Sequence, residues 1–168
     1  MAVVTTKSGP IINRDSTPQV LNNSCVERGR LLESVGTVEV ANGDSIGSKY
    51  IMCSIPSNAR ISQILLYSDD IGTTTIADFG LYKTTADGSA VVDADFFASA
   101  VSLKDGAING TDIAHEATTT YDIDDSEKMI WQALGLSSDS KIMYDVVATL
   151  TAAADAAGTL TLKVRYAI

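Results

Sequence analysis

Two strand patterns that follow one another along the chain constrain its fold most. Residues 61–67, Ile-Ser-Gln-Ile-Leu-Leu-Tyr, are rich in β-branched, aliphatic and aromatic side chains, which is typical of a strand covered on both faces. Residues 75–82 alternate, and one set of positions is expected to face a core: Thr75, Ala77, Phe79 and Leu81. Gly80 inside this run predicts a bulge or a close neighbour. Turn-forming residues precede and separate the two runs, so the other strands are expected to add around this pair.

The remaining segments predict an all-β protein. Further strand patterns cover residues 36–41, 49–55, 90–101, 117–123, 142–150 and 159–168, and residues 104–116, which lack a clear period, are expected to form a long loop. Asp125 to Leu134 predicts the single helix, of about three turns, because an acidic cap precedes it and Gly135 follows it. Seven or eight strands at this spacing predict a β-sandwich, and a jelly roll is a common eight-stranded form.

The segment 1–34 differs from the rest of the chain. Turn-forming pairs such as Gly9-Pro10 and Thr17-Pro18 interrupt it every few residues, so neither a strand period nor a helix period is sustained. Its apolar side chains are too many for a solvated tail. We therefore predict an extended N-terminal arm, residues 1–34, and a sandwich domain, residues 35–168, with the arm packed on its own body or on a partner chain.

The charge distribution argues against nucleic-acid binding. The net charge is −9, and residues 1–34 carry four basic and three acidic side chains. Residues 35–168 carry eight basic and eighteen acidic side chains. An acidic body repels phosphate backbones, because affinity for nucleic acids comes chiefly from Lys and Arg. We expect no nucleic-acid partner for the body.

The sequence also predicts no membrane partner and no disulfide framework. The opening Met1 to Thr6 lacks the basic and apolar regions of a secretory signal. No apolar run approaches the length that a membrane-spanning helix needs, so we expect synthesis in a cytoplasm and a soluble protein. Cys25 and Cys53 fall in no metal-binding spacing. Two reduced thiols are the simplest interpretation, and a bridge between them is the alternative.

No pattern predicts an enzyme, and no cofactor is implied. The sole histidine, His115, lies in the Gly/Asn-rich loop, where an ordinary surface role explains it. Carboxylate pairs such as Asp69-Asp70 and Asp93 with Asp95 are attributed to turns, where they cap the backbone rather than serve a glycosidase. A structural calcium ion is an alternative use of these loops, although no EF-hand spacing is present. Trp131 falls in the predicted helix rather than on a carbohydrate platform.

Three motifs carry a resemblance to a known family. They are Ile55-Pro56-Ser57-Asn58-Ala59-Arg60-Ile61, Asp78-Phe79-Gly80-Leu81-Tyr82 and Val91-Val92-Asp93-Ala94-Asp95-Phe96-Phe97-Ala98, joined by the helix at Glu127 to Gly135. With them, residues 54–168 resemble small virion proteins of tailed bacteriophages that act as head decoration or cement proteins. Residues 1–53 take no part in the resemblance.

The resemblance implies a non-enzymatic jelly-roll protein that binds the outside of a phage capsid. Its implied partners are the major capsid protein and itself, as a homodimer or homotrimer, and its implied place is the exterior of the virion after synthesis in the host cytoplasm. We predict that arm residues dock on the capsid or on a sister subunit, namely Val20, Leu21, Arg28, Arg30, Leu31 and Leu32. The alternative is a receptor- or glycan-binding module of a fibre or tail, because fold does not fix function.

Overall fold

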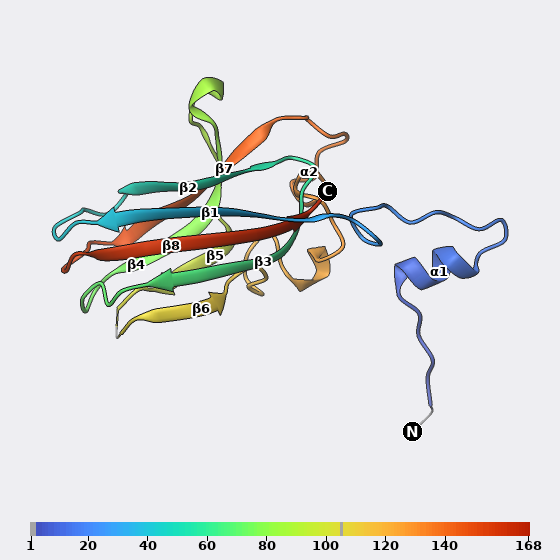
Figure 1. Ribbon diagram of the computed structural model, residues 1–168, viewed down its shortest axis with the longest axis horizontal. Helices are drawn as coiled ribbons and strands as arrows, with labels where there is room; N and C mark the ends of the chain where they lie inside the picture. Colours follow the sequence, from blue (N-terminus) through green and yellow to red (C-terminus); the bar gives the residue numbers. More distant parts are fainter. Residues whose placement is uncertain (1–2, 105) are drawn as a thin grey trace.

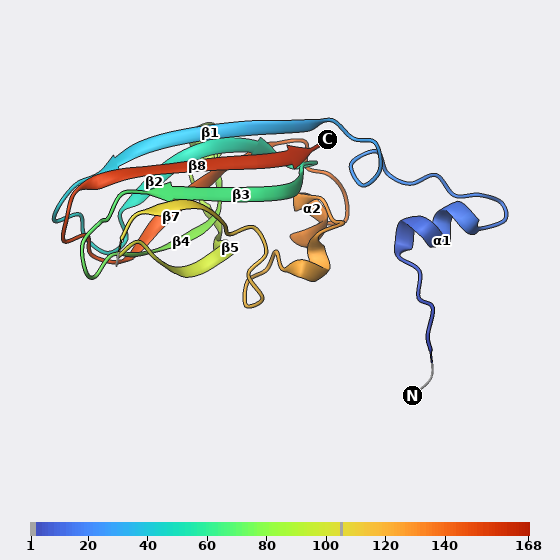
Figure 2. The same cartoon turned by 60° about the horizontal axis from the view of Figure 1, so that its bottom comes forward.

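Eight strands form two four-stranded antiparallel sheets in the computed structural model, which describes residues 3–104 and 106–168. The sheets have the orders β1-β8-β3-β6 and β2-β7-β4-β5 and form the two layers seen in Figures 1 and 2. The strands are β1 (Leu31–Val40), β2 (Lys49–Pro56), β3 (Arg60–Ser68), β4 (Ile76–Lys83), β5 (Val91–Ser102), β6 (Ile108–Asp112), β7 (Met143–Ala152) and β8 (Gly158–Ala167).

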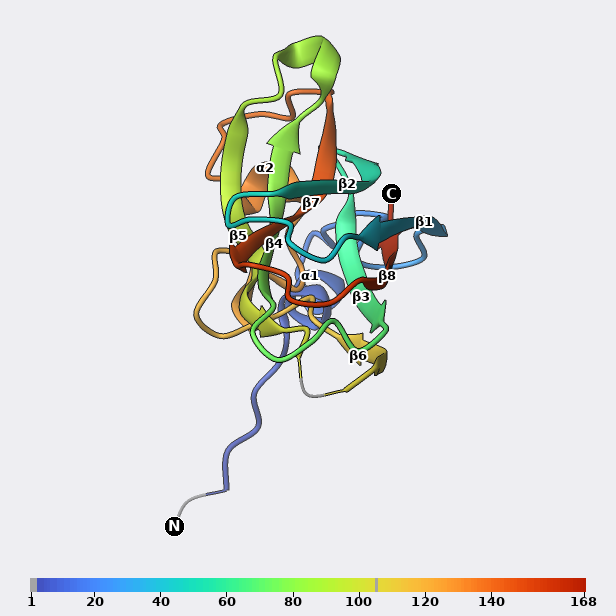
Figure 3. The same ribbon diagram turned by 90° about the vertical axis from the view of Figure 1, so that its left-hand side faces the viewer.

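The strand order is that of a jelly roll. Hydrogen bonds join β1 to β8, β2 to β7, β3 to β6 and β4 to β5, as if one long hairpin had been rolled up. The predicted jelly-roll-like β-sandwich is therefore confirmed. The β4–β5 hairpin, which carries the 3-10 helix η1 (Thr85–Asp87), projects from the body in Figures 1 and 3.

The core lies between the sheets, and β4, β5 and β7 each contribute consecutive buried residues. Phe79 and Leu81 of β4, like Thr75 and Ala77, are fully buried, which confirms the inward face predicted for residues 75–82. Both Phe96 and Phe97 of β5 are fully buried, and their rings meet edge to face with centroids 4.9 Å apart. Each such side chain contributes about 1.5–3 kcal/mol by burial.

Glycines allow two strands to approach their neighbours closely. A Cβ atom on Gly80 would lie 2.2 Å from the carbonyl oxygen of Asp93, where β5 bulges opposite β4. The bulge and close neighbour predicted at Gly80 are thus both present. At Gly36 of β1, a Cβ atom would lie 1.7 Å from the carbonyl oxygen of Met52 in β2. Gly36 therefore lets β1 and β2, which belong to different sheets, close one corner of the sandwich.

The predicted loop over residues 104–116 is wrong in part, because it contains β6. This strand pairs with the end of β3, from Leu65 opposite Asp112 to Ser68 opposite Ile108. Its sequence, Ile-Asn-Gly-Thr-Asp, lacks an apolar alternation because it is a short edge strand, and Gly110 has a left-handed φ of 77°. Asp105, within the predicted loop, lies outside the described residues.

The strand predicted at residues 117–123 is also wrong. This segment forms turns and then the 3-10 helix η2 (Ile123–Asp125). The Thr119 N–H and hydroxyl both donate to the carbonyl of Glu116, and the Asp122 side chain accepts from the Asp124 N–H. These local bonds outweigh the strand propensity of the threonines.

Of the helix predicted from Asp125 to Leu134, only the short helix α2 (Ile130–Ala133) is present, and Asp125 belongs to η2. Tertiary hydrogen bonds replace those of the missing turns, because the N–H groups of Ile130 and Trp131 donate to the carbonyls of Ala59 and Ser57. Met129 is extended, with φ −78° and ψ 160°. The helix nevertheless ends before Gly135 as predicted, because Gly135 has a left-handed φ of 69° and the Leu136 N–H donates to the Trp131 carbonyl.

The N-terminal arm projects beyond one end of the sandwich (Figures 1 and 2). Within the predicted extended arm, residues 9–15 form a short helix that was not predicted, α1 (Gly9–Asp15), where Pro10 occupies the first turn. Since β1 begins at Leu31, residues 31–34 of the predicted arm belong to a sheet. Residues 1 and 2 of the predicted arm lie outside the described residues.

Candidate functional site

The arm is fastened to the body at its root, residues 23–30. Asn23 holds the root in a tight turn, since its side chain accepts from the Cys25 N–H and its carbonyl accepts from Val26 and Glu27. Arg60 of β3 donates from Nε to the Cys25 carbonyl at 2.6 Å and from a terminal nitrogen to the Ser126 carbonyl at 3.2 Å. Arg60 therefore ties the root both to a strand and to the segment that follows η2.

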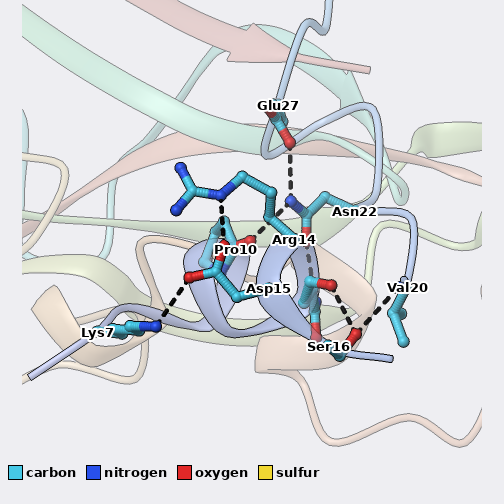
Figure 4. Close-up of polar contacts among 9 residues, drawn as sticks. Lys7, Pro10, Arg14, Asp15, Ser16, Val20, Asn22 and Glu27 are labelled. Atoms are coloured by element: carbon cyan, nitrogen blue, oxygen red, sulfur yellow. Dashed lines mark hydrogen bonds and ion pairs between the residues drawn. The ribbon is translucent and has the colours of Figure 1, made fainter. Parts of the chain in front are cut away.

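Beyond the root, one asparagine folds the arm back on itself. Asn22 donates from Nδ2 to the Pro10 carbonyl at 3.1 Å and to the Glu27 carboxylate at 2.7 Å, as Figure 4 shows. Its Oδ1 accepts from Asn13 at 2.9 Å. Asn22 thus joins helix α1 to the loop behind it, so that polar contacts determine the shape of the arm.

Ion pairs on α1 add to this polar framework. Asp15 accepts from the Arg14 Nε and from the Lys7 Nζ, each at 2.8 Å (Figure 4). The hydrogen bonds from Arg14 and Lys7 hold the pKa of Asp15 well below its usual range. All three side chains are largely open to solvent, so these pairs fix the local geometry more than they stabilise the fold.

Several apolar side chains of the arm remain exposed. None of the residues of α1 is buried, and Ile12 is 55% exposed. Leu21 is 89% exposed and Val20 is 49% exposed. An ordered segment that leaves its apolar side chains in water is typical of an interaction surface.

The structure brings together three of the six predicted docking residues. Val20, Leu21 and Arg28 line one hollow of about 480 Å³ that is built wholly from the arm, together with Arg14, Gln19, Asn22 and Glu27. Arg28 has a left-handed φ of 69°, which costs a residue with a Cβ some strain. We call Val20, Leu21, Arg14 and Arg28 the arm patch.

The other three predicted residues lie apart from the arm patch. Arg30 ends the root, where its carbonyl accepts from the N–H of Ile168. Leu31 and Leu32 are the first residues of β1, and Leu31 is 61% exposed whereas Leu32 is half-buried. Their docking role stays a prediction, and their place in a strand separates them from the arm.

Sequence reasoning does not single out Arg14 and Asn22. Arg14 reaches the arm patch only because residues 9–15 form a helix, and the proline in the first turn is the one available signal for it. The run Asn22-Asn23-Ser24 indicates only a break in the chain, whereas the structure shows that both asparagines organise the arm.

A second hollow, of about 520 Å³, lies where the edges of the two sheets meet. Its apolar lining comes from the end of β5 and from the segment after β6, and two carboxylates and two other polar residues complete it. We call it the edge groove, with the lining residues Ala98, Ser99, Ala100, Val101, Asp112, Ile113, Ala114, His115 and Glu116.

Backbone N–H groups fix both carboxylates of the edge groove. Asp112 Oδ1 accepts from the N–H groups of Ile64 and Ala114, at 3.0 and 3.1 Å. Glu116 Oε2 accepts from the N–H of Ser99 at 2.6 Å. A strand edge whose N–H is already bonded to a carboxylate is protected from pairing with another strand.

The groups considered for catalysis have structural partners. The ring of His115 stacks on Tyr121 with centroids 5.3 Å apart, and its Nδ1 lies 3.2 Å from the Asp122 carbonyl. The hydroxyl of Tyr121 donates to the Lys128 carbonyl and accepts from the Ile61 N–H, and burial raises the pKa of Tyr121 to about 12. Both rings therefore serve to hold the segment before η2 on the core.

The acidic residues also have local roles. Asp155 accepts a hydrogen bond from the Thr73 hydroxyl, which, together with bonds from the N–H groups of Thr73 and Thr74, lowers its pKa to about 2. Asp93 and Asp95 lie in β5 rather than in a turn, and the hydrogen bond between the two carboxyls raises the pKa of Asp95. Within residues 3–104 and 106–168, no group of three or more His, Cys, Asp or Glu side chains has the geometry to hold a metal ion.

Both cysteines are free thiols, as the simpler interpretation predicted. Cys25 is buried in the root of the arm, where its carbonyl accepts from Arg60. Burial raises the pKa of the half-buried Cys53 thiol to about 11, which keeps it protonated near neutral pH.

Lysine side chains cover two of the tyrosine rings. Lys163 lies over the ring of Tyr67 and Lys49 over the ring of Tyr82, at 5.0 and 4.9 Å from the ring centroids. A sugar ring stacking on either tyrosine would have to displace a lysine. In the described part of the chain, no helix has the length and apolar character needed to cross a membrane.

Comparison with solved structures shows that the fold occurs elsewhere. A chain in a structure of the cyanophage Pam1 capsid asymmetric unit is similar, with a TM-score of 0.50 and 17% sequence identity. The match covers 83% of this chain and 86% of that chain, so it includes most of the sandwich. No protein-family model matches the sequence, and no curated protein sequence matches it either.

Proposed function

We propose that this protein is a non-enzymatic structural component of a phage virion, which decorates the outside of the capsid and cements it by bridging major capsid subunits. The observation that carries the proposal is the arm, an ordered extension whose apolar side chains are exposed while polar contacts hold its shape. Exposed apolar side chains on such a segment form a surface that another protein can cover.

The comparison with the cyanophage Pam1 capsid supports a virion role. A chain of that assembly has the same fold over most of its length. A rigid jelly roll with a projecting arm suits a protein that contacts neighbours on a lattice, because each contact can be weak when many act together. The partners of the proposed role are the major capsid protein and other copies of this chain, as a homodimer or homotrimer.

The body supports a structural rather than a catalytic role. His115 and the loop carboxylates bond to their own backbone, and both thiols are buried or half-buried. Its acidity keeps the protein soluble and leaves the near-neutral arm as the region best suited to lie on another protein.

Co-sedimentation with undecorated phage heads tests the proposal. We expect saturable binding at a stoichiometry that matches symmetry positions of the lattice, and loss of binding when residues 1–22 are removed. The deletion stops before the root, so that Cys25 and its contact with Arg60 remain. Absence of binding by the full chain to intact heads of the matching phage would overturn the proposed function.

A matched pair of point variants separates docking from folding. Leu21→Asp changes a side chain that is 89% exposed on the arm, and Ile46→Asp changes one that is 68% exposed in the turn between β1 and β2. We expect the first variant to bind heads at least about tenfold more weakly, a loss of about 1.4 kcal/mol, and the second to bind as the unmodified protein does.

A further inference from the structure

The arm patch has an apolar centre and cationic neighbours. Leu21 is 89% exposed, and Val20 is 49% exposed. Arg14 and Arg28 line the same hollow, and Arg14 uses its Nε for Asp15, while its two terminal nitrogens point away from Asp15 in Figure 4. A partner for this patch therefore needs an apolar recess with acceptor groups beside it.

The edge groove of the body has these properties. Ala100 and Val101 supply the accessible part of its apolar lining, and the buried Ala98 and Ala114 also border its volume of about 520 Å³. The carboxylates of Asp112 and Glu116 stand beside this lining, and backbone N–H groups hold both in place. A Val-Leu pair flanked by arginines matches a groove flanked by carboxylates in polarity and in charge.

We infer that the arm patch of one copy docks in the edge groove of a second copy of this chain. The inference rests on the proposed function only in taking the arm as a docking element. In a single chain the patch does not occupy its own groove, because Leu21 is largely exposed and α1 lies beyond the end of the sandwich (Figures 1 and 2). The body carries eight basic and eighteen acidic side chains, whereas residues 1–34 carry four basic and three acidic ones, so the body of one copy repels the arm of another less than it repels a second body.

Disulfide trapping between two differently substituted proteins tests the contact directly. One protein carries Leu21→Cys and the other Ala100→Cys, a position that is exposed and lines the groove. A disulfide requires the two Cβ atoms to approach within about 3.5–4.5 Å, so its formation reports direct apposition. We expect the mixed disulfide to form at least about tenfold faster than in a control in which Ile46→Cys replaces Leu21→Cys.

Two properties make the trapping specific. Cys25 is buried and Cys53 is half-buried with a raised pKa, so the native thiols react slowly, and they are present equally in the control. Peptide mapping identifies the linked positions. A mixed disulfide that forms no faster than the control, or disulfides found only between two copies of the Leu21→Cys protein, would overturn the inference.

Native mass measured without phage heads provides a second test. We expect the full chain to self-associate, Leu21→Asp to weaken the association constant at least about tenfold, and Ile46→Asp to leave it unchanged. Association should also weaken as salt is raised from about 0.05 to about 0.5 M, because salt screens the arginine–carboxylate pairs. A monomer at all concentrations, or an oligomer insensitive to Leu21→Asp, would overturn the inference.

The two tests distinguish this inference from the proposed function. If Leu21→Asp abolishes binding to heads but leaves the native mass unchanged, and the trapping of Leu21→Cys with Ala100→Cys is no faster than in its control, the arm docks on the shell and the inference fails while the function stands. If trapping and mass respond as expected but no head is bound, the inference stands and the function fails.

Discussion

The body and the arm of this molecule are ordered in opposite ways. The body buries Phe79, Phe97 and its other large side chains between two sheets, so the hydrophobic effect stabilises it. Among its described residues the arm buries only Cys25, and Asn22, Asp15 and Arg60 hold its shape through polar contacts. The difference teaches that the body has a hydrophobic core of its own, whereas the arm holds its shape while leaving apolar side chains such as Leu21 uncovered.

The core of the body should show the largest mutational effect. Phe97→Ala removes a fully buried ring that packs edge to face on Phe96, and we expect it to lower the free energy of unfolding by about 3–5 kcal/mol. The arm counterpart, Ile12→Ala, should change it by less than about 0.5 kcal/mol, because Ile12 is 55% exposed. Urea denaturation of both variants measures the contrast, and similar losses would contradict it.

The next largest difference in stability between the body and the arm should come from glycine substitutions. A Cβ atom at Gly36 would lie 1.7 Å from the Met52 carbonyl oxygen, so Gly36→Ala should cost about 1–3 kcal/mol as the corner between β1 and β2 is forced apart. Gly9→Ala in α1 meets only the Glu127 carboxylate at 3.4 Å and favours the helix locally. The melting temperature should fall for the first variant only, and equal melting temperatures would argue against the close corner.

A mutation at the junction between the body and the arm should change the mobility of the arm more than the free energy of unfolding. Arg60→Gln removes the bonds to the carbonyls of Cys25 and Ser126, with an expected cost of about 0.5–1.5 kcal/mol. Trypsin should then cleave after Arg14 and Arg28 several-fold faster, while cleavage in the body changes little. Arg165→Gln, which loses an exposed pair with Glu33, is the control. Unchanged arm cleavage in Arg60→Gln would show that Arg60 does not fasten the root.

The smallest effect is expected from acid. The pKa of Asp155 is lowered from 3.8 to about 2, so its hydrogen bonds to Thr73 and Thr74 add stability that is present above about pH 4 and lost as the pH falls towards 2. Unmodified protein should melt above Asp155→Asn at pH 6, and the difference should disappear near pH 2. Asp15→Asn should not change the melting temperature at either pH, because Asp15 holds only the arm. A changed melting temperature for Asp15→Asn would show that the arm unfolds cooperatively with the body.

The fold was predictable where one strand carried enough apolar side chains. The patterns at residues 61–67 and 75–82 predicted β3 and β4 nearly complete, and the pattern at residues 159–168 predicted β8. The short edge strand β6 was not predicted, because its pairing with β3 depends on backbone groups and on Gly110, and its side chains are mainly polar. The predicted helix was too long because tertiary bonds from Ile130 and Trp131 replace helical ones.

The candidate site was only partly predictable for a similar reason. The exposed pair Val20 and Leu21 could be singled out because apolar residues in an arm without a strand or helix period imply an outside partner. Arg14 could not, since it joins them only through helix α1 and the asparagine that folds the arm back. The edge groove is assembled from β5 and the segment after β6, so it too depends on tertiary structure.

The pairing of β1 with β8 has a consequence for how the chain acquires its structure. Leu31 lies opposite Ala167, so one of the first strands to be synthesised finds its neighbour only when the final strand emerges. Contacts this distant in sequence make folding slow, because a long loop must close before any stabilisation is gained. Strand β3 also pairs with β8, so this pairing too can form only after β8 has been synthesised. The same holds for the hydrogen bond from the Ile168 N–H to the Arg30 carbonyl at the root. The root of the arm therefore gains its bond to Ile168 only after β8 has been made.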